Sequence, residues 1–139
     1  MKRTAFFISD GTGITAETIG HSVLTQFEGV DFETFRLPFV DTEEKAEHAA
    51  VRIRASQSNS GERSIVVNTI MDQQLSDIVA KGGGLMLDVF APFIGPLQDE
   101  LGMQRSSRVG KAHGLTNFAE YEARISMQRE AETWTPMQV

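Results

Sequence analysis

A short apolar run, residues 5–8, leads directly into a glycine turn and then into a helical pattern. In α/β proteins, a buried strand that breaks into such a turn presents backbone N–H groups at the start of the next helix, where they bind anions. Phosphate handling is therefore the first hypothesis for this chain. The candidates for phosphate or substrate binding within the turn are Ser9, Gly11, Thr12, Gly13 and Thr15.

The spacing of Gly11, Gly13 and Ala16 also fits the relaxed dinucleotide-binding fingerprint. That fingerprint needs an acidic residue at the end of the second strand, where it holds a ribose. Glu33 comes too early for this role, and Asp41 comes after the proline that ends the strand. A dinucleotide-binding domain of a small oxidoreductase is therefore the less favoured alternative.

A purely structural interpretation of the same turn is open as well. In it, Asp10 and Thr15 only satisfy local N–H groups, with Thr15 as the N-cap of the helix. Glu17 would then be favoured by the positive end of the helix dipole. The turn alone does not separate this interpretation from the functional one.

Composition bounds the class of protein. With 139 residues, 40% of them hydrophobic, the chain fits one globular domain. The net charge of −6 argues against a nucleic-acid partner, and the absence of cysteine excludes disulfides and thiolate metal sites. The three histidines show no metal-ligand spacing, so we expect no metal site. The N-terminal apolar run is too short for a signal or a membrane span, which predicts a cytoplasmic protein without a membrane partner.

Strand and helix patterns alternate along the chain. Strands are expected over residues 4–8, 32–37, 64–70 and 85–90. The first helix is expected to face the sheet through a stripe comprising Ala16, Ile19, Gly20, Val23, Leu24 and Phe27, with His21 off the stripe and solvated. The second helix is expected to be capped by Asp41 or Thr42 and to bury Ala46, Ala49, Ala50 and Ile53. A third helix is expected to start at Asp72, and a fourth to run toward Leu101. This alternation predicts a doubly wound, Rossmann-like sheet of about four mainly parallel strands flanked by helices.

In such a sheet ligands bind beyond the carboxyl ends of the strands. The connections over residues 9–13, 39–42 and 69–72 and the region after Asp88 are therefore expected to share one edge. The triple glycine at residues 82–84 precedes a strand instead of following one. It predicts a helix end and a flexible turn and not a phosphate loop.

The segment over residues 102–117 contains basic side chains and no acidic one. An excess of positive charge in an otherwise acidic chain can bind an anion, although a solvated loop is the commoner explanation. Its candidates for contact with phosphate or with a protein target are Arg105, Arg108, Lys111 and His113. A last, very polar helix is expected over residues 118–133.

Taken as an ordered series, these blocks resemble a known family: the bacterial and plant regulatory proteins of phosphoenolpyruvate synthase and of pyruvate, phosphate dikinase. The matching residues are Phe7 to Glu17, Gly20, His21, Leu37 to Val40, Ala91, Pro92, Pro96, Leu97, His113, Gly114, Leu115, Tyr121, Ala123, Arg124 and Ile125. The resemblance covers nearly the whole chain.

The resemblance implies a bifunctional serine/threonine kinase and phosphorylase. Such a protein uses ADP to phosphorylate a threonine of phosphoenolpyruvate synthase or of the dikinase, and inorganic phosphate to remove the phosphoryl group as pyrophosphate. The family's P-loop lies in a second portion, beyond the Tyr-x-x-Arg-Ile region. The resemblance therefore predicts an N-terminal α/β domain at residues 1–133 and a tail at residues 134–139. It also implies that the P-loop domain and the main ADP site of the family are absent. ADP and phosphate are the implied ligands, Mg²⁺ is a further candidate, and a homodimer is left open.

Phosphoryl transfer needs cationic and N–H donors around the phosphates and a carboxylate for the attacking group or a metal. Asp10 is the best-placed carboxylate and is the candidate catalytic residue, as a base or metal orienter. Whether this chain alone is an enzyme is open. The alternative is a non-catalytic module for docking the target enzyme or for dimerisation.

Overall fold

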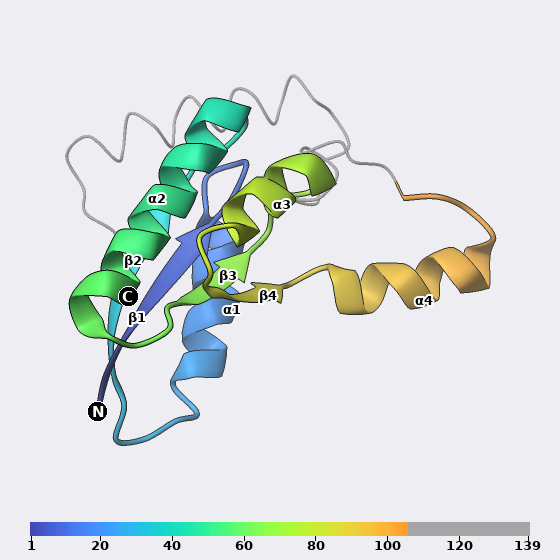
Figure 1. Cartoon of the computed structure of the whole chain (residues 1–139). Coiled ribbons are helices and arrows are strands. Elements are labelled where there is room, and N and C mark those ends of the chain that lie inside the picture. Colours follow the sequence, from blue (N-terminus) through green and yellow to red (C-terminus); the bar gives the residue numbers. More distant parts are fainter. Residues whose placement is uncertain (106–139) are drawn as a thin grey trace.

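Strands and helices alternate over residues 1–105, which are the residues that the computed structural model describes (Figure 1). The strands are β1 (Lys2–Ile8), β2 (Asp31–Leu37), β3 (Ile65–Asn68) and β4 (Leu85–Asp88), and the helices are α1 (Ile14–Leu24), α2 (Glu43–Ser60), α3 (Gln73–Ala80) and α4 (Ala91–Leu101). The strands form one parallel sheet in the order β2-β1-β3-β4. The doubly wound α/β fold predicted from the alternation is confirmed. The predicted boundary at residue 133 and the helix over residues 118–133 lie outside the described residues.

The core lies on both faces of the sheet because successive side chains of a strand point to opposite faces. Phe6 and Ile8 of β1 pack with the buried side chains of α2 and α3. Phe7 packs on the other face with α1. The inward alanines of α2 are buried as predicted, Thr42 and Asp72 are the N-caps of α2 and α3, and no residue of β1 from Ala5 to Ile8 is more than 2% exposed.

The buried face of α1 differs from the predicted stripe. Its buried residues are Ala16, Glu17, Gly20 and Leu24, whereas Ile19 and Val23, and Phe27 beyond the helix, are exposed. The reason is the close approach at Gly20, where an added Cβ would overlap Cε1 of Phe7. A helix that contacts the sheet at a glycine lies close to it. It therefore buries one narrow row of residues spaced four apart, and its larger side chains point outward. The prediction that His21 is solvated is also wrong, because its ring packs on Phe7 with centroids 4.9 Å apart.

The triple-glycine turn is held by long side chains from α2 and from the segment between α2 and β3. Arg54 donates to the carbonyl of Lys81 at 2.9 Å and Gln57 to that of Gly82 at 3.2 Å. Arg63 donates to the carbonyls of Gly83 and Gly84 at 3.2 and 3.3 Å. The predicted helix end is confirmed, but these bonds restrain the turn that was expected to be flexible. A phosphate loop presents N–H groups to its ligand, whereas this turn presents carbonyl oxygens to Arg54 and Arg63.

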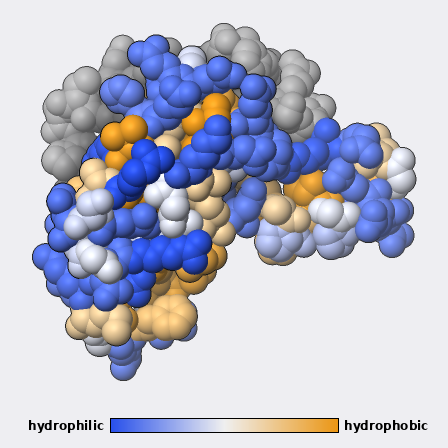
Figure 2. All heavy atoms as spheres, viewed as in Figure 1, coloured by the Kyte–Doolittle hydropathy of each residue, from blue (hydrophilic) through white to orange (hydrophobic). Residues whose placement is uncertain are grey.

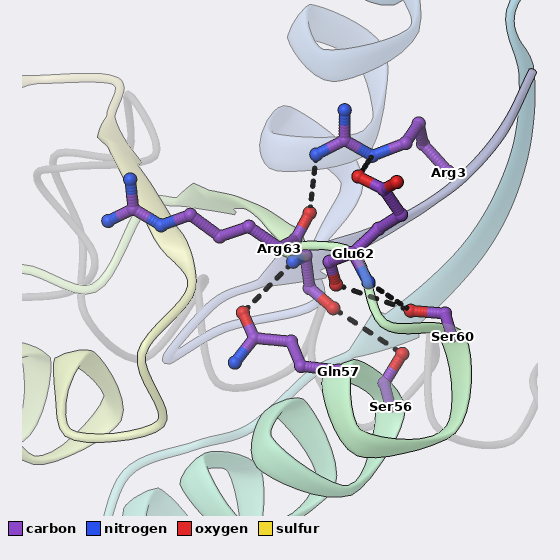
Figure 3. Close-up of polar contacts among 7 residues, drawn as sticks. Arg3, Ser56, Gln57, Ser60, Glu62 and Arg63 are labelled. Atoms are coloured by element: carbon purple, nitrogen blue, oxygen red, sulfur yellow. Dashed lines mark hydrogen bonds and ion pairs between the residues drawn. The ribbon is translucent and has the colours of Figure 1, made fainter.

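A polar cluster fixes the entry into β3 (Figure 3). The side-chain oxygen of Gln57 accepts the N–H of Ser64 at 2.9 Å. Arg3 of β1 donates to the carbonyl of Arg63 at 2.7 Å and lies 3.9 Å from the carboxylate of Glu62. The start of β3 is therefore tied both to α2 and to the central strand.

Helix α4 stands away from the layered part of the molecule (Figure 1). None of its residues is buried, and Phe93, Leu97 and Leu101 are 68%, 51% and 63% exposed. Apolar atoms are accordingly visible among hydrophilic ones on this arm (Figure 2). Among the helices of residues 1–105, none has the length and apolar character required to cross a membrane.

Gly20→Ala should lower the free energy of unfolding by about 1–3 kcal/mol, because the new methyl group overlaps the Phe7 ring and overpacks the core. Alanine is the better helix former, so its propensity acts in the opposite direction. Urea denaturation would measure the difference. Gly95→Ala in α4 is the matched control, since a Cβ there meets nothing within 4 Å. A Gly20→Ala protein as stable as the Gly95→Ala protein would contradict this account of the α1 packing.

Candidate functional site

The carboxyl ends of the four strands lie in one row. The register pairs Ile8 with Leu37 and with Asn68, and Asn68 with Asp88. The connections that follow these residues therefore begin at the same edge of the sheet, as predicted. We call this side of the molecule the carboxyl edge.

The turn after β1 is fixed by hydrogen bonds to the connection after β2. The N–H of Ser9 donates to the carbonyl of Leu37 at 3.2 Å, and the carbonyl of Ser9 accepts the N–H of Val40 at 2.9 Å. The carbonyl of Gly11 accepts the N–H of Phe39 at 2.8 Å. The hydroxyl of Ser9 is fully buried and accepts the N–H of Gly11 at 2.9 Å. Ser9 therefore shapes the turn from inside, and its role in phosphate or substrate binding stays a prediction.

Asp10 connects this turn to the end of β3. Its side chain is 5% exposed, and its Oδ2 accepts the N–H of Met71 at 2.9 Å. The carbonyl of Met71 in turn accepts a bond from Arg105 Nη2 at 2.6 Å. Asp10 and Arg105, far apart in the sequence, thus converge on one residue of the carboxyl edge. Arg108, Lys111 and His113, the other basic candidates, lie outside the described residues.

Helix α1 begins at the turn with Gly13 as its N-cap. Gly13 has a φ of 88°, in the left-handed region that favours glycine, and no side chain caps the helix. Thr15 is the second residue of the helix, so the interpretation that made it the N-cap is wrong. Thr12 Oγ1 accepts the N–H of Ile14 at a long 3.4 Å. The first turn of α1 therefore offers N–H groups and a partial positive charge at the carboxyl edge.

Two residues that were not among the predicted site candidates, Arg36 and Glu17, lie next to the glycine turn. Arg36 of β2 packs its stem on Gly13, where an added Cβ would lie 2.9 Å from Arg36 Cδ. Glu17 of α1 is 8% exposed; its burial raises its pKa, and the positive charge of Arg36 partly offsets that rise. An arginine inside the apolar run Phe35-Arg36-Leu37 was the available signal, but only the register shows that it faces α1.

A residue with a strained backbone conformation lies at the carboxyl edge. Phe39, which donates to the turn carbonyl, has a φ of 58°, the one positive value outside glycine among residues 1–105. An aromatic residue in this conformation costs free energy that the surrounding contacts must offset. The cost is consistent with a connection held in place for more than packing.

The position of Glu33 in β2 does not favour the alternative of a dinucleotide-binding site. Glu33 pairs with Thr4 in the register, four residues before the end of β2. It lines a cavity of about 390 Å³ beside α2, together with Phe35 and Arg52, and not the carboxyl edge. The ribose-binding acid that a dinucleotide site requires at the end of the second strand is therefore not supplied by Glu33. Within residues 1–105, no group of three or more acidic or histidine side chains could hold a metal ion.

Comparison with known proteins adds an independent line of argument. The family model described as kinase/pyrophosphorylase matches residues 5–128. Relatives from Xanthomonas oryzae pv. oryzae and Stenotrophomonas maltophilia are 57% and 56% identical over 124 and 131 residues, and both carry the name "Putative phosphoenolpyruvate synthase regulatory protein". The matches cover 89% and 94% of this chain but 45% and 48% of those relatives. The chain therefore spans just under half the length of the curated relatives it matches.

Glu17→Gln should gain stability relative to the wild-type chain as the pH rises. Because burial raises the pKa of Glu17 above its ordinary value of 4.5, the folded protein binds this proton more tightly than the unfolded chain. Wild-type stability is therefore lost as the pH rises through 4.5 to the folded-state pKa, and glutamine removes that loss. Urea denaturation of both proteins between about pH 4 and about pH 7 measures the effect. The exposed Glu47→Gln is the control, and a pH-independent difference for Glu17→Gln would refute the assignment.

Proposed function

The chain belongs to the kinase/pyrophosphorylase family, and on that premise we propose that it supplies part of a phosphoryl-handling site in a regulator of phosphoenolpyruvate synthase. In the proposed forward reaction, a threonine hydroxyl of the target attacks the β-phosphorus of ADP, AMP leaves, and the hydroxyl proton is lost. In a second proposed reaction, inorganic phosphate attacks the phosphorus of the phosphothreonine, pyrophosphate is formed, and the threonine oxygen leaves and takes up a proton. Pyruvate, phosphate dikinase is the alternative target.

The observation that carries this proposal is the placement of Asp10 at the carboxyl edge, beside the start of α1 and bonded to Met71. Both reactions need phosphoryl oxygens held by N–H donors and a carboxylate within reach of the attacking group. The turn supplies the first through the N–H groups of Gly13 and of the first turn of α1, with the hydroxyls of Thr12 and Thr15 as further donors. The N–H of Gly11 is already donated to the Ser9 hydroxyl, so Gly11 contributes through the shape of the turn. Asp10 supplies the second.

The remaining candidates take different roles. The Arg105 guanidinium is bound to the carbonyl of Met71, so we assign it to positioning that segment and not to direct contact with phosphate. Arg108, Lys111 and His113 stay proposals for contact with phosphate or with the target. Mg²⁺ usually takes one or two protein carboxylates and several phosphate or water oxygens. Asp10 is the residue that would hold it, and the ion would neutralise phosphoryl charge.

Calorimetric titration of the 139-residue chain with phosphate, pyrophosphate and ADP, each with and without Mg²⁺, tests the proposal. We expect pyrophosphate to bind in both conditions and more tightly with Mg²⁺. Asp10→Asn keeps an acceptor for the Met71 N–H but removes the charge, so it should abolish the gain from Mg²⁺, a loss of about 10-fold in affinity. Asp77→Asn, on the exposed side of α3, should bind as the wild type does. No anion binding by the folded wild-type chain would refute the proposal.

The exposure of α4 favours a second candidate, a module that docks the target enzyme. An amphipathic helix of 11 residues is marginally stable alone in water, and none of its residues is buried in this chain. An apolar face presented on such an arm is suited to a protein partner. The two candidates are compatible, since a protein kinase must also hold its substrate.

Replacing both Phe93 and Leu97 by serine should leave the free energy of unfolding within about 0.5 kcal/mol of the wild type, because both side chains are already exposed. The same protein should lose its capture of purified phosphoenolpyruvate synthase in a surface-binding assay. Val51→Ser, an exposed site on α2, is the control for a general loss of apolar surface. Equal capture by the double variant and the wild type, or none by either, would remove α4 as a docking face.

A further inference from the structure

The helices of residues 1–105 cover the two faces of the sheet unequally. A strand takes up about 4.8 Å of a sheet's width and a helix about 10 Å, so one helix covers about two strands. Helices α2 and α3 together pack on one face of the four-stranded sheet. On the other face, the buried side chains of α1 pack with β1 and β3. The outer strands of that face therefore have no helix of residues 1–105 directly over them.

The two outer strands differ in the side chains that they present on this face. Leu87 of β4 pairs with Val67, which belongs to the core on the α1 side, so Leu87 and Leu85 point to that side as well. Each of the two leucines is 40% exposed. The positions of β2 on the same face include Thr34 and Arg36, which are polar. The outer strand β2 is therefore suited to water, as natural sheet edges are, whereas β4 is suited to a covering group.

Exposed apolar side chains of α1 border the same area. A right-handed crossover from β1 to β2 makes α1 run antiparallel to the strands, with its buried row, which includes Gly20, facing them. In a right-handed helix of this direction, the residue before each buried one points away from β2 and toward β3 and β4. Ile19 and Val23 occupy such positions and are 37% and 47% exposed. With Leu85 and Leu87 they form an apolar surface that we call the β4 face.

Helix α4 does not cover the β4 face. Its direction is fixed where it begins, because Asp88 Oδ1 accepts the N–H groups of Phe90 and Ala91 at 2.9 and 3.0 Å. None of its residues is buried, as packing on the sheet would require. The chain nevertheless returns to the carboxyl edge after α4, since Arg105 Nη2 donates to the carbonyl of Met71 at 2.6 Å. The residues after Arg105 therefore start close to the sheet.

The sequence after Arg105 contains a segment that matches this surface. Phe118, Tyr121 and Ile125 are spaced three and four residues apart, which gives one apolar row on the helix expected over residues 118–133. The row is about 10 Å long, and the four residues of β4 extend over about 13 Å. A helix with one narrow apolar row and polar residues elsewhere covers an apolar strip on one side and faces water on the other. The connection over residues 106–117 can span up to about 40 Å, which is ample for the return.

We propose that residues 118–133 cover the β4 face, with their apolar row against Leu85 and Leu87. Because the chain arrives from the carboxyl edge, this segment runs antiparallel to β4. Residues 106–117 are then anchored at both ends, by the Arg105 bond and by the covering segment. The proposal needs no bound anion and stands apart from the proposed function. Where that function holds, the anchoring keeps the basic candidates of residues 106–117 beside the carboxyl edge.

Thiol alkylation tests the proposal, because the chain has no cysteine and an introduced one is its only thiol. Iodoacetamide should alkylate Leu87→Cys about 10-fold more slowly than Val51→Cys, a site on α2 whose native side chain is 57% exposed. Adding Tyr121→Ser and Ile125→Ser should raise the rate of Leu87→Cys about 10-fold and leave that of Val51→Cys unchanged. Val79→Cys, at a position with 0% exposure, reports global unfolding and should stay unreactive with the serine pair present.

The other outcomes overturn the proposal in distinguishable ways. An unchanged rate of Leu87→Cys with the serine pair means that residues 118–133 do not cover the β4 face. A rate raised only by Phe93→Ser with Leu97→Ser identifies α4 as the cover, and protection lost on dilution identifies a second copy of the chain. If Leu87→Cys does not fold, Leu85→Cys on the same face is compared in the same way. No readout involves phosphate or pyrophosphate, so a failure here leaves the proposed function standing, and the reverse also holds.

Discussion

The structure depends on the way the end of the central strand is bonded to both of its neighbours. Ser9 and Gly11 make three backbone hydrogen bonds with the end of β2 and the connection after it, and the carbonyl of Ile8 accepts the N–H of Thr69 after β3. The turn that starts α1 is therefore fixed by backbone groups before any side chain contributes. A turn held in this way can present N–H groups in a constant geometry, which is what binding an anion with little reorganisation requires.

Two acidic side chains are buried at this edge. Asp10 accepts the N–H of Met71, whereas Glu17 lies in the field of Arg36. Burying carboxylates costs free energy, and a domain built for stability alone would place apolar residues there. Their presence beside a strained Phe39 follows the pattern in which functional sites keep charges and strain that the rest of the fold offsets.

Sequence reasoning recovered the features that are local in the chain. The strand and helix alternation, the Asp72 cap and the alanine face of α2 each depend on residues a few positions apart. It failed for α1, because hydrophobicity alone could not show that the helix meets Phe7 at Gly20. It also missed Arg36 and the role of Met71. Their contacts depend on the register between strands and on a loop returning from α4, and neither is encoded by spacing within one segment.

A single phosphoryl subsite is consistent with both directions of the proposed chemistry. The β-phosphoryl group of ADP and that of the phosphothreonine expose similar tetrahedral oxygens, so a turn with N–H donors would bind the transferred group of either compound by the same contacts. Such contacts neutralise charge without distinguishing the attached group. The two reactions would then differ in the group that attacks the bound phosphoryl group, which is the threonine hydroxyl when ADP is bound and inorganic phosphate when the phosphothreonine is bound. Selectivity for the target would come from surfaces outside the turn, of which the exposed face of α4 is one.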